Sequence, residues 1–410
     1  MLSTWTLRSR RVSVMLLLAM AILTGVVASD AAATTTQVPE GATAGAAPHV
    51  ATAVAPGLTG KGVPAPAAAP RSRKPKVVVI GTGGTIAGVS DSRVSFQTYK
   101  SGQLPIGKLL DDLGPEFKDV ADVKGVDFGT TDSASYTMKD YYDLSRAVDQ
   151  QLAKADAVVV STGTTTMEEL GYWLDLTVRS DKPVVLTGAI RPWTVISSDG
   201  PANLYNAVML AASGRTGCFG SVLLLNDQIL PARDATKSNT TRLDTFTAPE
   251  LGLLGVVDET RIRLERAPAR VQKCGKEAWR TPFDLARIDR AKLPRVEVVY
   301  TYQEAGGEAI TAYANAGVKG IVVAGAPSPQ QVTAAMEVAK RGTVLAGANR
   351  NNAGATYTDA PWVLPAGDLP PQKARLLLML ALASSNDPAR IQSWFAEYGD
   401  PEFDVAAAQH

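Results

Sequence analysis

Histidine is almost absent from this chain of 410 residues, which has only two. His49 lies in a stretch of low complexity and His410 is the last residue, so neither suits a folded active site. The shortage argues against a Ser-His-Asp or Cys-His mechanism and against histidine ligation of a metal. Any catalysis by this chain is expected to use hydroxyl groups, carboxylates, lysine or tyrosine.

Cysteine and net charge are also scarce. Cys218 and Cys274 are too few for a disulfide scaffold or a cysteine metal site, and the sequence leaves open whether they pair. Lys and Arg number 41 against 40 Asp and Glu, so the net charge of +1 gives no electrostatic reason to expect nucleic acid or an anionic membrane as partner. Hydrophobic residues make up 45%, enough to bury a core in one large or two medium domains.

The N-terminal segment has the features of export. Three arginines precede an apolar run at residues 14–27, and small residues follow at 31–33. This order predicts a secretory signal peptide over residues 1–33, because the run is too short for a comfortable membrane span. Twin-arginine export and an uncleaved anchor are the alternatives. Residues 34–74, rich in Ala, Pro, Gly and Thr, predict a disordered linker, and the protein is expected to be secreted or periplasmic, with no membrane attachment once the signal is removed.

Strand and helix patterns alternate from residue 76 onward, which predicts an α/β fold. A large N-terminal domain at residues 75–260 is expected to hold a mainly parallel sheet flanked by helices. Thr137 is the expected N-cap of its first long helix, and Thr166 and Glu169 are expected to form a capping box at the second. The expected strands are residues 77–80, 157–160, 183–186 and 221–225, and the expected helices are 138–154 and 166–178.

A second, smaller α/β domain is predicted at residues 291–410. Residues 261–290 are charged and lack a clear period, so they predict a connection between the domains. Within the smaller domain the expected strands are residues 296–300, 320–324 and 343–345, and the expected helices are 308–316, 328–340, 371–383 and 388–398.

Two threonine-rich turns each follow an expected strand. The first is TGGTIAG at residues 82–88, and the second is TGTTTMEE at residues 162–169. Open α/β sheets bind ligands at the carboxyl ends of their strands. Thr85, Thr164 and Thr165 are therefore expected to surround one site.

A nucleotide site is the first alternative for the earlier turn, since Gly81 and Gly83 follow a strand. Such a site needs a helix to begin at once, so that its N-terminus meets the pyrophosphate. Residues 89–97 have no helical period, and no acidic residue ends a second strand at the expected distance. We therefore do not interpret the turn as a dinucleotide site; threonines that merely cap each turn remain an alternative.

Together the two turns resemble the signatures of the bacterial-type L-asparaginase family, also called asparaginase/glutaminase. The resemblance covers nearly all of residues 76–398, with further matches at residues 188–192, 199–201, 203–207, 233–240 and 372–375. It implies an amidohydrolase that splits a small-molecule side-chain amide into an acid and ammonia through a threonine, without a metal or other cofactor. It also implies a homotetramer whose sites lie between the large domain of one subunit and the small domain of another.

The resemblance implies a role for four residues. Thr85 matches the first, nucleophilic threonine, and Tyr99 matches the tyrosine on a mobile lid, here expected at residues 89–103, that polarises it. Thr164 matches the second threonine and Lys237 its lysine partner. A threonine hydroxyl needs a nearby base or lysine to take its proton, and the N–H groups of glycine-rich turns can stabilise an oxyanion.

The candidate substrate-binding residues are Thr130, Thr131, Gly163 and Thr165, and they depart from the family pattern. Thr165 stands where the family has Asp, and Thr130 and Thr131 stand where it has a Ser-Gln pair. Thr162 likewise replaces the family's His. In the family the Asp and Gln hold the substrate's α-amino group, and each lost charge-assisted bond is worth about 1.5–3 kcal/mol. Binding of free asparagine is therefore expected to be weak.

A third acceptor is missing as well. Residues 352–358, which align with the segment that supplies a carboxylate from the neighbouring subunit, contain no acid. Asp132 could partly substitute if its side chain turns inward. The loss of Asp at position 165 is also expected to lower the pKa of Lys237, which makes it a better general base.

These observations predict a secreted, asparaginase-like amidohydrolase whose nucleophilic machinery survives while recognition of the amino acid is altered. An amidase for an amide without a free α-amine is one alternative. A non-catalytic binding protein on the same scaffold is another, and a peptidase or esterase that uses the same threonine is a third.

Overall fold

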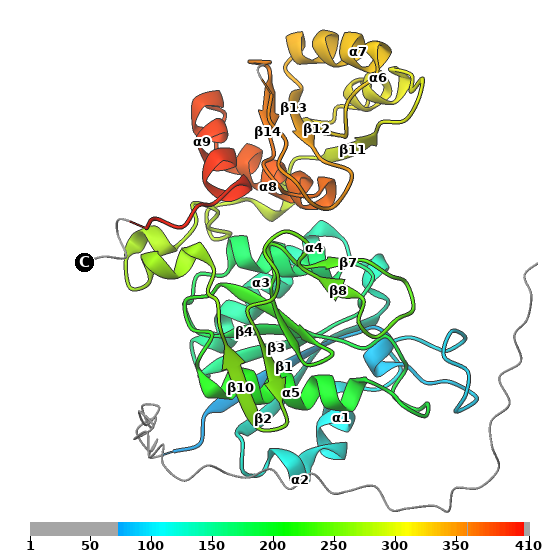
Figure 1. Ribbon diagram of the computed structural model, residues 1–410, viewed down its shortest axis with the longest axis vertical. Coiled ribbons are helices and arrows are strands. Elements are labelled where there is room, and N and C mark those ends of the chain that lie inside the picture. Colours follow the sequence, from blue (N-terminus) through cyan, green and yellow to red (C-terminus); the bar gives the residue numbers. More distant parts are fainter. Residues whose placement is uncertain (1–72, 359, 406–410) are drawn as a thin grey trace, which may run out of the picture. The chain divides into compact units, whose positions relative to one another are not determined.

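The computed structural model describes residues 73–358 and 360–405, and all of them lie within one compact unit (Figure 1). The expected signal peptide, nearly all of the expected linker and both histidines lie outside the described residues. None of the helices in the described ranges combines the length and the apolar character that crossing a membrane requires.

A mainly parallel sheet of eight strands forms the centre of the larger domain, as predicted. Its order is β10-β9-β6-β5-β4-β3-β1-β2, with parallel pairing from β2 through β5 and antiparallel pairing from β5 to β10. The strands are β1 (Lys76–Gly83), β2 (Asp122–Thr131), β3 (Ala157–Ser161), β4 (Val184–Thr187), β5 (Ser221–Leu225), β6 (Gln228–Pro231), β9 (Gly255–Asp258) and β10 (Arg261–Leu264).

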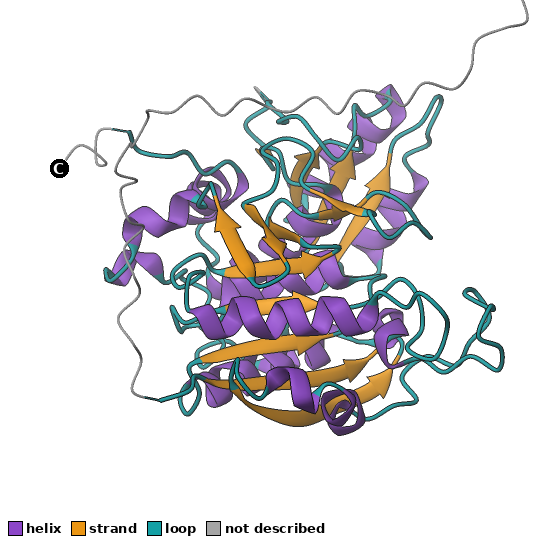
Figure 2. Cartoon of the chain, turned by 60° about the horizontal axis from the view of Figure 1, so that its bottom comes forward, coloured by secondary structure: helices purple, strands orange, loops and turns teal. Residues whose placement is uncertain are grey.

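Helices cover both faces of this sheet (Figure 2). Successive side chains of a strand point to opposite faces, so Val77 and Val79 join one apolar cluster while Val78 and Ile80 join another. Residues of α1 and α5 complete the first cluster, and residues of α3 and α4 complete the second. The helices are α1 (Ile106–Asp112), α2 (Gly114–Phe117), α3 (Met138–Leu152), α4 (Met167–Thr177) and α5 (Gly200–Ser213).

The start of α3 confirms the predicted N-cap. Thr137 Oγ1 accepts the N–H of Asp140 at 3.3 Å, and the Asp140 carboxylate accepts the N–H of Thr137 at 2.7 Å. The two residues form a capping box, which satisfies N–H groups that the first helical turn leaves without partners.

The capping box predicted for α4 is wrong. Thr166 occupies the N-cap position without a side-chain cap, because its hydroxyl instead donates to the Ser133 carbonyl at 3.1 Å. Glu169 faces the guanidinium of Arg375 at 3.9 Å rather than the start of its own helix. Thr166 and Glu169 therefore bind residues of other segments instead of forming the capping box with each other.

The smaller domain holds a four-stranded parallel sheet in the order β11-β12-β13-β14. Apolar residues of α6 and α7 pack on one face, and those of α8 pack on the other. The strands are β11 (Val296–Tyr300), β12 (Gly320–Ala324), β13 (Val344–Ala348) and β14 (Val363–Pro365), and the helices are α6 (Glu308–Asn315), α7 (Pro329–Lys340), α8 (Pro371–Ser384) and α9 (Pro388–Gly399).

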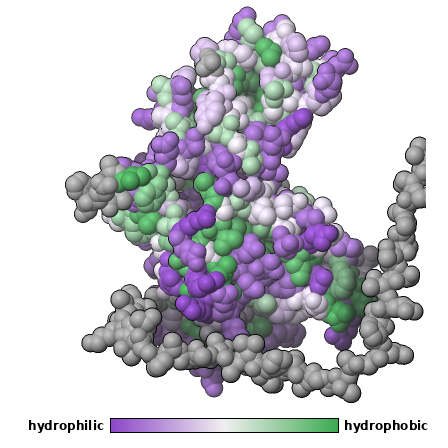
Figure 3. Space-filling model, in the orientation of Figure 1, coloured by the Kyte–Doolittle hydropathy of each residue, from purple (hydrophilic) through white to green (hydrophobic). Residues whose placement is uncertain are grey.

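The segment between the two sheets differs from the simple connection expected at residues 261–290. Its first residues, Arg261–Leu264, form β10 and extend the larger sheet. Three short 3₁₀ helices follow: η3 (Ala269–Lys273), η4 (Glu277–Trp279) and η5 (Arg290–Lys292). A disulfide joins Cys218, after α5, to Cys274 in this segment, which answers the question that the sequence left open. Figure 3 shows a surface that is mostly polar in this view, with apolar residues in separate patches.

Candidate active site

The two threonine-rich turns meet at the carboxyl edge of the larger sheet. β1 and β3 are neighbours, with Gly81 opposite Ser161, and the chain turns just beyond this pair. Gly84, at φ +83°, lies so close to the second turn that a Cβ on it would stand 2.3 Å from Gly163 Cα. Only glycine fits both this conformation and this approach. The contact brings Thr85 and Thr164, which follow the two glycines, to the same place.

Thr85 and Tyr99 form the first hydroxyl pair of the site. Thr85 Oγ1 and the Tyr99 hydroxyl share a hydrogen bond of 2.6 Å, although the two residues are 14 positions apart in the sequence. The pair is fixed at both ends of the intervening segment, since Val89 and Lys100 exchange backbone hydrogen bonds of 2.8 and 2.9 Å. Gly102 N–H also donates to Gly84 O at 3.1 Å. Both ends of the expected lid at residues 89–103 are therefore anchored beside the first turn.

The lid also rests on the loop that precedes α5. Ile196 N–H donates to Arg93 O at 2.9 Å, and the Arg191 guanidinium lies 4.9 Å from the centre of the Phe96 ring. Arg191 is itself held by the carbonyl and hydroxyl oxygens of Ser197, at 3.0 and 2.8 Å. Arg191 thus connects the loop before α5 to the lid.

Thr164 and Lys237 form the second pair. Lys237 Nζ donates to Thr164 Oγ1 at 2.9 Å from the two-residue strand β7 (Thr236–Lys237), which pairs with β8 (Phe246–Thr247). Burial lowers the pKa of Lys237, while the carboxylates of Glu168 and Asp132 act in the opposite direction. The direction agrees with the sequence-based prediction, and burial is the principal cause.

The candidate substrate-binding threonines lie at this edge with exposed side chains. Thr130 and Thr131 end β2 and are exposed, as is Thr165 in the second turn. Their backbone is tightly built: Thr131 O accepts the N–H of Gly84 at 3.1 Å, and a Cβ on Gly102 would stand 1.9 Å from Thr130 O. The hydroxyl groups are thus presented on a fixed backbone.

Asp132 follows directly and is the exposed carboxylate whose charge acts on Lys237. Its Oδ1 accepts the N–H of Ala134 at 3.2 Å, at the start of the short turn η2 (Ser133–Ser135). Asp132 therefore lies close enough to the second pair to influence it, while one of its oxygens is occupied by the turn.

The sequence analysis did not predict the polar residues that surround the backbone of Lys237. Glu168, which is buried, accepts the backbone N–H of Lys237 at 2.7 Å and the Gln372 side-chain amide at 2.6 Å. Lys373 is fully buried and donates to backbone carbonyls just before Lys237. A signal was present, because polar residues gather at the start of a helix whose later residues are nearly all apolar, but the sequence does not say where that helix packs.

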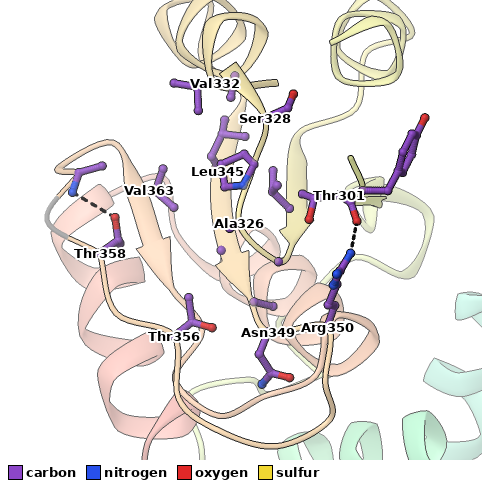
Figure 4. Close-up of a pocket in the computed structure, with 18 of the residues that line it drawn as sticks. Thr301, Ala326, Ser328, Val332, Leu345, Asn349, Arg350, Thr356, Thr358 and Val363 are labelled. Atoms are coloured by element: carbon purple, nitrogen blue, oxygen red, sulfur yellow. Dashed lines mark hydrogen bonds between the residues drawn. The ribbon is translucent and has the colours of Figure 1, made fainter. Parts of the chain in front are cut away.

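A cavity with a volume of about 1180 Å³ lies elsewhere, in the smaller domain (Figure 4). It opens beyond the carboxyl ends of β11, β12 and β13, where Arg350 donates to Thr301 O at 2.6 Å. The four predicted catalytic residues are all described, and none of them lines this cavity. Glu304 is the one carboxylate among the described residues that do.

Two threonine hydroxyls thus lie at adjacent strand ends of an α/β fold, one hydrogen-bonded to a tyrosine and the other to a lysine. The family described as "Asparaginase, N-terminal" matches residues 76–270, and "Glutaminase/Asparaginase C-terminal domain" matches residues 295–395. The chain belongs to the asparaginase/glutaminase family and is an asparaginase-like amidohydrolase.

Similar proteins cover most of the chain. It is 39% identical to a probable periplasmic L-asparaginase of Haemophilus influenzae, an alignment that spans 79% of this chain and 93% of the relative. It is 38% identical to L-asparaginase 2 of Escherichia coli over the same shares, and 34% identical to a glutaminase-asparaginase of Acinetobacter glutaminasificans over 79% and 100%. A crystal structure of a probable cytoplasmic L-asparaginase from Campylobacter jejuni matches 79% of this chain and all of that one, with a TM-score of 0.74 and 36% identity.

Proposed function

We propose that the protein hydrolyses an asparagine-type side-chain amide with Thr85 as the nucleophile. Thr85 Oγ1 attacks the amide carbon, the carbon–nitrogen bond breaks, and ammonia leaves after taking up a proton. Water then cleaves the resulting threonine ester to release the acid. The observation that carries the proposal is the 2.6 Å hydrogen bond between Thr85 and Tyr99, because a polarised hydroxyl is what such an attack requires.

Thr164 and Lys237 support the same reaction in this proposal. The lowered pKa of Lys237 favours its neutral form, which can take a proton that an attacking hydroxyl or water releases. We propose that the Thr164 hydroxyl relays that proton, which its hydrogen bond of 2.9 Å to Lys237 Nζ supports. The second pair thus supplies the base that the first pair lacks.

Ammonia release from the purified protein tests the proposal. The substrates are asparagine, glutamine, N-acetylasparagine and simple amides, each with the wild type and with Thr85→Ala. We expect Thr85→Ala to abolish release, and Thr311→Ala on α6 serves as the matched control. If no amide gives ammonia before or after the change, the chain is a binding protein on this scaffold. Chromogenic esters and peptides address the peptidase or esterase alternative.

A specific observation favours an amide without a free α-amine as the true substrate. The exposed side chain at position 165 is a threonine, so it offers a hydroxyl where an ammonium group would need a carboxylate. We propose that kcat/KM is higher for N-acetylasparagine than for asparagine. A high asparagine turnover with a micromolar KM contradicts this part and leaves the nucleophile untouched.

We also propose export to an oxidising compartment. The N-terminal pattern of residues 1–33 and the Cys218–Cys274 disulfide support it, because disulfides persist mainly outside the cytosol. One relative is named periplasmic and one solved structure is named cytoplasmic, so names alone do not decide. Cell fractionation with sequencing of the mature N-terminus tests this: a mature chain that begins near residue 34 supports cleavage.

A homotetramer is the assembly that we propose. Exposed tyrosines, Tyr300, Tyr302 and Tyr357, lie at or beside the cavity of the smaller domain, and large exposed apolar groups favour association. If that surface covers the Thr85 site of another copy, Glu304 is the candidate for the neighbour's carboxylate. Light scattering measures the assembly, and Glu304→Gln is expected to raise KM for asparagine but not for N-acetylasparagine.

A further inference from the structure

The first turn of α8 reaches into the larger domain. Lys373 is fully buried, and its Nζ donates to three backbone carbonyls, those of Ala232, Arg233 and Ala235, at 2.9, 2.6 and 2.6 Å. An ammonium group has three donors, so this site uses all of them. Burial lowers the pKa of Lys373 to about 8, while the charges of Glu168 and Asp234 act in the opposite direction.

The segment that Lys373 binds leads directly to the candidate catalytic lysine. Lys237 is the second residue after Ala235, and the strand that contains it, β7, is only two residues long. Such a short strand has little pairing of its own to fix its position. Arg233, in the same segment, is held by the carboxylates of Asp234 and Asp368. The place of Lys237 is therefore set by contacts outside its own strand.

Glu168 completes the support from the other side. Its Oε2 accepts the backbone N–H of Lys237 at 2.7 Å, and its Oε1 accepts the side-chain amide of Gln372 at 2.6 Å. Glu168 lies in the first turn of α4, directly after the turn that carries Thr164. One carboxylate thus ties together the lysine backbone, the second threonine turn and the start of α8.

We propose that Gln372 and Lys373 are positioning residues: through Glu168 and the carbonyls of residues 232–235, they hold Lys237 Nζ against Thr164 Oγ1. The inference rests on the proposed function of the Thr164–Lys237 pair. It assigns the smaller domain of the same chain a part in the geometry of the active site. Gln372 and Lys373 act on the reaction through Lys237 and do not touch the substrate.

Gln372→Leu removes the tether while leaving the volume of the side chain nearly unchanged. A misplacement of about 1 Å in a catalytic group can lower the rate about 100-fold. We expect kcat to fall about 10- to 100-fold with KM within about threefold of the wild type. Gln392→Leu, at an exposed position of α9, is the matched control and should leave both constants unchanged. Equal kcat for Gln372→Leu and wild type would overturn the proposal.

An exchange of the two hydrogen-bonding partners separates positioning from general support of the fold. Gln372→Glu places two carboxylates face to face, so kcat should fall about 10-fold or more. Adding Glu168→Gln restores a donor opposite an acceptor, and we expect kcat to return to within about threefold of the wild type. Losses that simply add in the double variant would contradict the proposal.

Lys373→Arg and Lys373→Met test the carbonyl contacts. We expect Lys373→Met to lower kcat at least as much as Gln372→Leu does, with partial rescue in Lys373→Arg. If Lys373→Met fails to fold, the Gln372 variants carry the test. Lys340→Met, at an exposed position of α7, is the control for loss of a lysine.

Crystal structures of the variants decide the inference independently of turnover. In Gln372→Leu and Gln372→Glu we expect Lys237 Nζ to move beyond hydrogen-bond distance from Thr164 Oγ1, and in the double variant we expect it to return. An unmoved Lys237 in all of them overturns the positioning role. If the wild type itself hydrolyses no amide, the proposed function fails on that assay, and the structures still judge the contact.

Discussion

At the scale of single residues, the site depends on which groups surround Lys237. Burial lowers its pKa, and the carboxylates facing it are Glu168 from α4 and Asp132 from the loop after β2. A buried ammonium is disfavoured unless negative charge compensates it. Burial, opposed by one buried and one exposed carboxylate, therefore sets the pH at which Lys237 becomes a base.

We predict an acidic limb in the pH profile of kcat/KM that reports the pKa of Lys237. Activity should rise with pH as Lys237 loses its proton, with a midpoint below 10.5 because the pKa is lowered from that value. Glu168→Gln removes a charge that raises this pKa, so the limb should move to lower pH. A limb that stays in place or moves upward would contradict the assignment, and Glu337→Gln on α7 is the control.

Thr165 controls recognition of an α-amino group in our proposal. We predict that Thr165→Asp lowers KM for asparagine about 10- to 100-fold, because it adds one charge-assisted hydrogen bond worth about 1.5–3 kcal/mol. KM for N-acetylasparagine should not improve, and Thr241→Asp at an exposed position is the control. The added charge should also raise the pKa of Lys237, which shifts the acidic limb upward.

Sequence motifs predicted which residues gather at the site, and the structure brings them together. Thr85 is hydrogen-bonded to Tyr99, and Lys237 is hydrogen-bonded to Thr164. The catalytic roles of all four residues stay predictions. Gln372 and Lys373 were recognised only as part of a family match. Their contacts depend on where α8 packs, and no local pattern encodes a contact between residues 204 apart.

At the scale of helices and strands, the ends of the helices show what local pattern can and cannot determine. The Thr137 cap of α3 formed as predicted, since its partner Asp140 lies three residues along the same chain. The Thr166 cap did not form, because Ser133 offers its hydroxyl a tertiary partner. A cap predicted from neighbouring residues therefore forms where no residue from a distant segment competes for the same side chain.

We predict that Thr137→Ala lowers the free energy of unfolding by about 1 kcal/mol, the usual cost of losing such a cap. Urea denaturation measures the change, and Thr98→Ala, at an exposed position, is the comparison. Equal midpoints for the two variants would show that the capping box contributes nothing.

The apolar strands were the elements that could be predicted. β5, β11 and β12 occupy the expected residues, since short buried runs of branched side chains are typical of parallel strands. β10 was not expected, because its sequence alternates arginine with an aliphatic residue in a charged region. A strand at the edge of a sheet needs few buried side chains, so it leaves little signal.

At the scale of the whole molecule, one covalent link joins distant parts of the chain. The disulfide connects Cys218 to Cys274 across 56 residues. Nearby, Arg270 lies 4.0 Å from the Trp279 ring centre and forms an ion pair with Asp175, so the link fastens a segment that is also held by packing. The pairing could not be predicted, because two cysteines alone do not reveal their distance.

We predict that replacing Cys218 and Cys274 by serine lowers the free energy of unfolding by about 2–5 kcal/mol. Loss of a link across a long loop raises the entropy of the unfolded chain. Urea denaturation of the double variant, beside the wild type with and without reductant, measures the effect. The reduced wild type should match the variant, and a midpoint unaffected by reductant would contradict the prediction.

The hydrogen bonds from α8 to the backbone before Lys237 have a consequence for hybrid enzymes. A crossover placed between the two sheets would join the front half of one relative to the back half of another. Such a recombinant keeps every candidate catalytic side chain, yet the side chains at residues 372 and 373 must still meet carbonyls and a carboxylate that come from a different parent. Shuffling within this family should therefore treat the opening turn of α8 as belonging with the front half.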